Sequence, residues 1–170
     1  MGGNEKEKAL GAPSNGGGAS AHRVLLVCSA GGHLAQLHRL APWWSQHERV
    51  WVTGSTADAA TLLAGETTYG AYFPTTRSVK NLIRNFVLGW RVLRRHRPEV
   101  VVSNGAGIAL PFFVLARLFG IRTVYIEVYD RVTSRTLTGR LCRPFSDLFL
   151  VQWPEQQRLY KGSVTIGTLY

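Results

Sequence analysis

The side chains best suited to chemistry in this chain follow short turns that contain glycine. Residues 29–33, with Gly31, Gly32 and His33, come directly after an apolar run. Glycines at such a turn let backbone amides approach an anion such as a phosphate. His33 can donate a hydrogen bond there or take a proton near neutral pH. A plain strand-to-helix turn explains Gly31 and Gly32 equally well, so this loop alone leaves both interpretations open.

Two further loops place polar side chains at the same kind of position. Asn104 and Gly105 follow one apolar run, and Glu127 ends another. Asn104 is favoured as a helix cap because side chains of its type are preferred there, with contact to a sugar as the alternative. Burial at the mouth of an apolar strand can raise the pKa of Glu127, which makes it a candidate base. An ion pair between Glu127 and Arg131 explains this residue as well.

These loops need strands that end side by side. Apolar segments alternate with helical patterns along the chain, which implies parallel strands joined by right-handed crossovers. The strands are continuous apolar runs, as expected when helices cover both faces of a sheet. We therefore predict an α/β fold with a Rossmann-like parallel sheet whose three loops face one crevice. The expected strands are residues 23–28, 50–53, 69–73, 99–103, 121–127 and 147–152, and the expected helices include 57–63, 79–96 and 108–119.

One folded domain and a short leader account for the chain of 170 residues. Residues 1–22 are rich in Gly, Ser and Asn, so we predict a disordered, cytoplasmic leader, with the domain over residues 23–170. Cys28 and Cys142 are far apart, which argues against a zinc site or a disulfide framework. The dinucleotide fingerprint G-x-G-x-x-G and the lysine-bearing P-loop are absent. No cofactor and no metal are therefore expected.

Positive charge is concentrated in the folded part. The formal net charge is +10, and residues 77–97 hold several basic side chains and no acidic one. Such a surface attracts the phosphates of nucleic acids, anionic lipids or pyrophosphate-bearing substrates. No recognised nucleic-acid motif accompanies the charge, so we predict no nucleic-acid partner. A basic nucleic-acid-binding module remains the alternative from another functional class.

The helix predicted over residues 79–96 is amphipathic, with basic side chains largely opposite its apolar face. This arrangement suits docking on the surface of an anionic membrane. Packing of the apolar face on the sheet is an equal alternative. No apolar run reaches the length of a transmembrane helix. The membrane-facing residues we predict are Leu82, Phe86 and Trp90, with Arg84 and Arg91.

A series of short motifs runs through the second half of the chain. They are Ser103-Asn104-Gly105, then Tyr125-Ile126-Glu127 with Arg131-Val132 and Ser134, then Val151-Gln152-Trp153-Pro154 with Tyr160, and finally Gly167-Thr168-Leu169. In this order they resemble the asparagine-linked-glycosylation protein fourteen-like family, whose bacterial members belong to exopolysaccharide and capsule gene sets. The resemblance covers Val24 to Tyr170. It implies a GT-B glycosyltransferase cut into two chains, of which this chain is the amino-terminal half.

The same resemblance implies partners and a location. The acceptor is a polyprenyl-pyrophosphate-linked glycan, bound by this half. The partner is the carboxyl half, which binds the UDP-sugar, either UDP-GlcNAc or another, so this chain is expected to be inactive alone. Eukaryotic members begin with a membrane-spanning helix, whereas this chain begins with its polar leader. We therefore expect peripheral attachment to the cytoplasmic face of the cell membrane.

The family is also similar to the amino-terminal domain of the murein N-acetylglucosaminyltransferase. The glycine-loop histidine and the strand-end glutamate of that enzyme match His33 and Glu127, which makes these two residues the catalytic candidates. The expected acceptor- and phosphate-binding residues are Gly31, Gly32, Asn104, Gly105 and Arg131. A structural anchor, with every catalytic group on the partner, is a further alternative.

Overall fold

A parallel sheet organises the protein, whose structure, a computed structural model, describes residues 20–169. The sheet has seven strands in the order β3-β2-β1-β4-β5-β6-β7, and every neighbouring pair is parallel. The predicted Rossmann-like sheet is therefore confirmed. Residues 1–19 of the predicted leader lie outside the described residues. The strands are β1 (Arg23–Val27), β2 (Glu48–Thr53), β3 (Thr68–Gly70), β4 (Val100–Ser103), β5 (Arg122–Ile126), β6 (Leu148–Val151) and β7 (Val164–Thr165).

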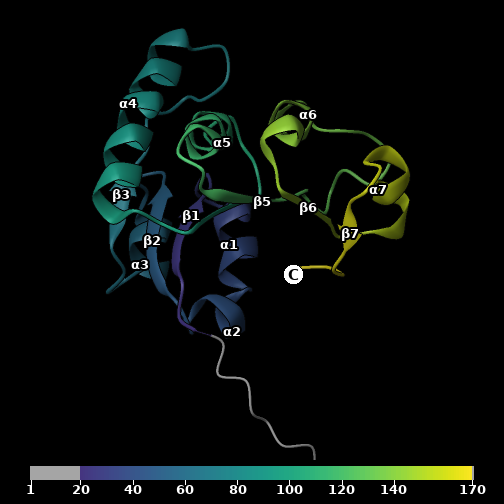
Figure 1. The fold of residues 1–170 in the computed structure, drawn as a ribbon, viewed down its shortest axis with the longest axis horizontal. Coiled ribbons are helices and arrows are strands. Elements are labelled where there is room, and N and C mark those ends of the chain that lie inside the picture. The colour runs from purple at the N-terminus through teal and green to yellow at the C-terminus, as the bar shows by residue number, and fades with distance from the viewer. Residues whose placement is uncertain (1–19, 170) are drawn as a thin grey trace, which may run out of the picture.

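Helices cover both faces of this sheet (Figure 1). One face carries α1 (Gly32–His38), α2 (Ala41–Trp44) and α3 (Ala57–Leu62). The other face carries α4 (Val79–His96), α5 (Ala109–Leu118) and α6 (Leu137–Cys142). A short 3-10 turn, Arg143–Phe145, follows α6, and α7 (Pro154–Leu159) follows β6.

Two apolar clusters fill the spaces between the sheet and its helices. Leu25 and Val27 of β1 belong to the cluster under α4 and α5, whereas Val24 and Leu26 belong to the cluster under α1 and α3. Successive side chains of a strand point to opposite faces, so one strand supplies both clusters. This two-sided burial explains why the strand is a continuous apolar run in the sequence.

The long elements follow the sequence prediction closely. α4 spans the predicted residues 79–96, and α5 lies within the predicted helix 108–119. The prediction omits α2, α6, α7 and β7, each of which has six residues or fewer. Segments this short show too little periodicity to be distinguished from turns.

β3 ends at Gly70 rather than at the predicted Phe73, because its partner strand β2 ends at Thr53, which is level with Gly70. The side-chain amide of Asn85 accepts the N–H of Tyr72 and donates to the carbonyl of Tyr72, both at 2.9 Å. The backbone of Tyr72 is therefore bound to α4 instead of to a strand. Asn81, one turn earlier, donates in the same way to the carbonyl of Pro74 at 3.1 Å.

The two asparagines show that α4 turns a partly polar face toward the protein. Asn81, Asn85 and Gly89 are buried, whereas Ile83 and Trp90 are exposed. Packing of the predicted apolar face on the sheet therefore accounts for only part of that face. At Gly89 the helix comes close to α5, because a Cβ built there would lie 3.0 Å from Cδ1 of Leu115.

The close approach of α4 to α5 can be tested with Gly89→Leu. We expect this variant to lower the free energy of unfolding by about 1–3 kcal/mol, because the added side chain overpacks the contact with Leu115. Urea unfolding followed by circular dichroism measures the change. The control Val87→Leu lies on the exposed side of the same helix and is expected to stay within about 0.5 kcal/mol of the wild type. Equal stabilities of the two variants would contradict close packing at Gly89.

Candidate functional site

The three loops singled out in the sequence leave the sheet side by side. β4 lies between β1 and β5, and Ser103 at its end is level with Val27 and with Tyr125. The loops that carry His33, Asn104 and Glu127 therefore start from adjacent strand ends, as predicted for ligand sites of open parallel sheets.

His33 and Asn104 hold each other by two hydrogen bonds. Nδ2 of Asn104 donates to the backbone carbonyl of His33 at 2.7 Å, and Nδ1 of His33 lies 3.1 Å from the backbone carbonyl of Asn104. A carbonyl oxygen can only accept, so this contact assigns the proton to Nδ1 of His33. In the neutral ring the lone pair is then on Nε2. Burial lowers the pKa of His33, an effect that its bonds to Asn104 and the nearby Asp130 oppose.

The prediction that Asn104 caps the following helix is wrong. α5 begins at Ala109, and the position before it, Ile108, makes no side-chain cap. The chain first turns through the left-handed region at Gly105 (φ 108°) and Ala106 (φ 56°), which carries Asn104 away from the helix. Asn104 is fully buried, and its Oδ1 has no hydrogen-bond partner within residues 20–169.

Glu127 is fully buried at the end of β5. Its carboxylate accepts hydrogen bonds from the N–H of Val128 at 3.0 Å, from the hydroxyl of Thr136 at 3.0 Å and from the hydroxyl of Tyr160. Burial raises the pKa of Glu127, as predicted, while these bonds oppose the shift. Thr136 also caps α6, since its hydroxyl accepts the N–H of Gly139. Glu127 thereby joins the end of β5 to the start of α6 and the end of α7.

The alternative of an ion pair between Glu127 and Arg131 is wrong. No salt bridge joins these side chains within the described part of the chain. Arg131 is exposed, whereas the carboxylate of Glu127 faces hydroxyl groups inside the protein.

The glycine loop is open to solvent. A Cβ built on Gly31 or Gly32 would meet nothing within 4 Å, and Gly31 has a φ of 72°, which favours glycine. The N–H of Gly31 donates to the carboxylate of Asp58 at 3.2 Å. An anionic group therefore already contacts this loop, supplied by the protein itself.

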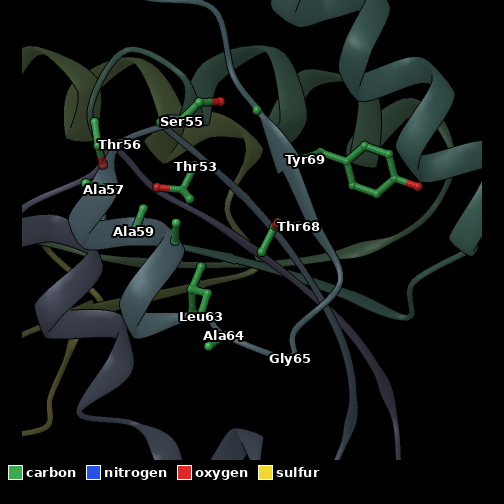
Figure 2. Close-up of a pocket in the computed structure, with 13 residues that line it drawn as sticks. Thr53, Ser55, Thr56, Ala57, Ala59, Leu63, Ala64, Gly65, Thr68 and Tyr69 are labelled. Atoms are coloured by element: carbon green, nitrogen blue, oxygen red, sulfur yellow. The ribbon is translucent and has the colours of Figure 1, made fainter.

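Two pockets lie near α3, and one of them is lined in part by the glycine loop. The pocket in Figure 2, of about 580 Å³, opens between α3 and β3, with the hydroxyl groups of Thr53, Ser55 and Thr56 toward one end and Leu63 toward the other. A second pocket, of about 440 Å³, is lined by residues 29–30, 54–56, 71 and 73. His33, Asn104 and Glu127 line neither pocket; His33 is partly exposed beyond the end of β1, whereas Asn104 and Glu127 are buried.

Sequence reasoning missed the residues that support Glu127 and the loop after it. Thr136 binds Glu127, and Gln152 and Gln156 bind the loop that follows Glu127. Gln152 belongs to a motif quoted above, but its burial depends on Gln36 of α1 and on the backbone of Glu127, which are distant from it in sequence. Within residues 20–169, no group of three His, Cys, Asp or Glu side chains gathers where it could hold a metal ion.

The lowered pKa of His33 predicts a pH dependence of stability. The folded protein binds the proton less readily than the unfolded chain, whose pKa is near the ordinary value of 6.5. The contribution of His33 to the free energy of unfolding is therefore fully present above this pH and is lost as the pH falls below it. Urea unfolding at about pH 7.5 and about pH 5 should show that the free energy of unfolding falls more for the wild type than for His33→Gln. Equal losses would contradict a depressed pKa.

Comparison with known proteins identifies the family. The family model described as "Oligosaccharide biosynthesis protein Alg14 like" matches residues 72–169, which include Asn104 and Glu127. The UDP-N-acetylglucosamine transferase subunit ALG14 of Mus musculus is 28% identical over 179 residues, covering 86% of this chain and 82% of that protein.

Solved structures share the fold at low sequence identity. MurG of Acinetobacter baumannii has a TM-score of 0.71 and 16% identity, over 88% of this chain and 46% of that chain. A UDP-N-acetylglucosamine 2-epimerase from Rickettsia bellii has a TM-score of 0.67 and 13% identity, over 85% of this chain and 43% of that one. This chain thus spans about half the length of each, equivalent to one half of a GT-B architecture. From the match over residues 72–169, the chain belongs to the Alg14-like family of oligosaccharide biosynthesis proteins.

Proposed function

We propose that this chain is the acceptor-binding, membrane-recruiting subunit of a two-chain glycosyltransferase. The enzyme transfers a sugar from UDP-GlcNAc or another UDP-sugar to a polyprenyl-pyrophosphate-linked glycan. One observation carries the proposal: an Alg14-like chain folds as about half of a MurG-like architecture, with a partly exposed candidate base beyond the carboxyl end of the sheet. The donor site belongs to the partner chain, which closes the crevice from the other side.

His33 is the general base of the proposed reaction. Its lowered pKa keeps the ring neutral at pH 7, and the bond from Nδ1 to Asn104 leaves Nε2 to accept a proton. An acceptor hydroxyl attacks the anomeric carbon of the donor sugar while Nε2 takes its proton. The bond from that carbon to the UDP oxygen breaks, and UDP leaves with the electron pair. His33 then returns the proton to solvent.

Glu127 serves this reaction by holding the site together. Its carboxylate is buried and accepts bonds from Val128, Thr136 and Tyr160, so a substrate hydroxyl does not reach it in this conformation. These bonds fix the start of the loop that carries Arg131. The proposed contribution of Glu127 to catalysis is therefore indirect.

The pyrophosphate of the acceptor binds near the glycine loop and Arg131. Gly31 and Gly32 are open to solvent, so a phosphate can approach their backbone without meeting a side chain. Arg131 is exposed and forms no ion pair within residues 20–169. Asn104 and Gly105 shape the neighbouring wall, where Gly105 lies against the hydroxyl of Tyr125.

Reconstitution with the donor-binding partner tests this assignment. We expect no transfer by either chain alone and transfer of sugar from UDP-GlcNAc to a polyprenyl-pyrophosphate acceptor by the pair. His33→Ala should lower kcat of the pair by roughly 10²–10⁴-fold, because it removes the base. Glu127→Gln keeps the shape of the buried side chain and should have a much smaller effect.

The outcomes separate three interpretations. Transfer by the isolated chain would refute the division of the site between two chains. Unchanged turnover for both variants would favour a structural anchor with every catalytic group on the partner. A larger loss for Glu127→Gln than for His33→Ala would make Glu127 the base. Circular dichroism and pull-down of the partner confirm that each variant folds and assembles.

The outer side of α4 supports recruitment to the cytoplasmic face of a membrane. Ile83 is 58% exposed, Val87 45% and Trp90 44%, whereas the predicted contacts Leu82 and Phe86 are half-buried. The basic side chains of residues 77–97, including Arg84 and Arg91, form no ion pair within the described residues. Exposed apolar groups beside uncompensated cations suit an anionic lipid surface. No helix among residues 20–169 is long and apolar enough to span a bilayer.

Binding to liposomes tests this surface. The double variant Ile83→Ser, Val87→Ser loses two exposed apolar side chains, each providing on the order of 1 kcal/mol of interfacial burial. We expect at least about a tenfold weaker partitioning onto anionic liposomes, measured by sedimentation. The matched control Leu62→Ser, Val164→Ser changes similarly exposed side chains on α3 and β7 and should bind as the wild type does. Equal binding by the two double variants would rule out α4 as the contact.

A further inference from the structure

A group of buried amide side chains lies beneath the loop that follows Glu127, and the proposed reaction does not use it. Gln152, just after β6, is 1% exposed, and Gln156 in α7 is 0% exposed. Polar side chains are seldom buried unless their donors and acceptors are satisfied. The partners of these two glutamines therefore indicate what they do.

The segment 152–156 binds the backbone of the loop 127–131 through its side chains. Three of its side chains donate hydrogen bonds to four carbonyl groups of that loop. The bonds run from Gln152 Nε2 to the carbonyl of Glu127 (2.9 Å), from Gln156 Nε2 to those of Val128 (2.8 Å) and Arg131 (3.2 Å), and from Trp153 Nε1 to that of Tyr129 (2.7 Å).

The remaining atoms of Gln156 anchor it to the turn before α7. Its Oε1 accepts the N–H groups of Gln152 at 2.8 Å and Trp153 at 3.1 Å. Both protons of its amide nitrogen and its oxygen are therefore engaged. Because Gln156 sits at a fixed place in the helix, its bonds hold the loop at a fixed distance from α7.

Gln152 extends the same support to two other segments. Its Nε2 also donates to Oε1 of Gln36 on α1, at 2.9 Å, and its Oε1 accepts the N–H of Leu169 at 2.8 Å. α1 is the helix that follows the glycine loop. α1 and the loop 127–131 are thus tied to one buried side chain.

A loop whose carbonyl groups are held in this way has little conformational freedom left. Surface loops usually satisfy their carbonyls with water and remain mobile. Here the ordering entropy is lost when the protein folds, so it is not lost again when a ligand binds. The side chain of Arg131 consequently projects from a backbone that is already in place.

We propose that Gln156 is a positioning residue, which holds the loop 128–131 in the conformation that receives the acceptor, and that Gln152 fixes this loop relative to α1. The identity of the ligand as the acceptor rests on the proposed function. The rigidity of the loop does not depend on it.

Hydrogen–deuterium exchange tests the rigidity directly on the full chain. Gln156→Glu and the uncharged Gln156→Met both remove donors to the loop, and we expect exchange of amides 128–133 to become roughly tenfold or more faster. Exchange in β1 and β4 should stay unchanged. The control Gln157→Glu adds the same charge at an exposed neighbour whose side chain contacts Ser163 instead of the loop. Unchanged loop exchange in both Gln156 variants would overturn the inference, whatever their activity.

Kinetics of the assembled pair tests the link to the acceptor. We expect the Gln156 variants to raise KM for the acceptor by about tenfold or more while KM for the UDP-sugar stays the same. A variant that only lost folded protein would lower kcat and leave both KM values unchanged. Faster loop exchange with an unchanged acceptor KM would overturn the role in acceptor binding. Absence of transfer by the wild-type pair would instead reject the proposed function, and loop exchange would still decide whether Gln156 holds the loop.

Discussion

The parallel pairing of β4 with both β1 and β5 is the constraint on which the candidate site depends. Ser103 is level with Val27 on one side and with Tyr125 on the other. A slip of one residue in either pair would turn the strand's side chains to the opposite faces of the sheet. It would also separate His33 from Asn104, whose two mutual bonds need the loops after β1 and β4 at one level.

Polar side chains are buried at the carboxyl ends of the strands, where the loops of the candidate site must be rigid. Asn104, Glu127, Gln152 and Gln156 are each at most 1% exposed, and all lie close to the carboxyl ends of β4, β5 and β6. Apart from Oδ1 of Asn104, their polar side-chain atoms have partners among residues 20–169. A satisfied buried network adds less stability than an apolar core, but it specifies one arrangement of the backbone. Such departures from simple apolar packing are expected at functional sites.

The fold by itself does not determine the reaction. MurG and a UDP-N-acetylglucosamine 2-epimerase are both similar to this chain in structure, at 16% and 13% identity. Function must therefore be argued from the groups at the site. Here the decisive features are a histidine with its Nε2 lone pair free, an open glycine loop and an exposed apolar and basic helix face.

The sequence by itself determined the fold class, the longer elements and the grouping of three loops, because apolar runs and helical periodicity are local patterns that burial enforces. It also identified His33 and Glu127 as the side chains to consider. Only the tertiary structure decided that Glu127 is enclosed by hydroxyl groups, that Asn104 binds His33 instead of capping a helix, and that Gln156 holds the neighbouring loop. Each of these outcomes depends on partners distant in sequence, and residue type and spacing do not determine which distant groups meet.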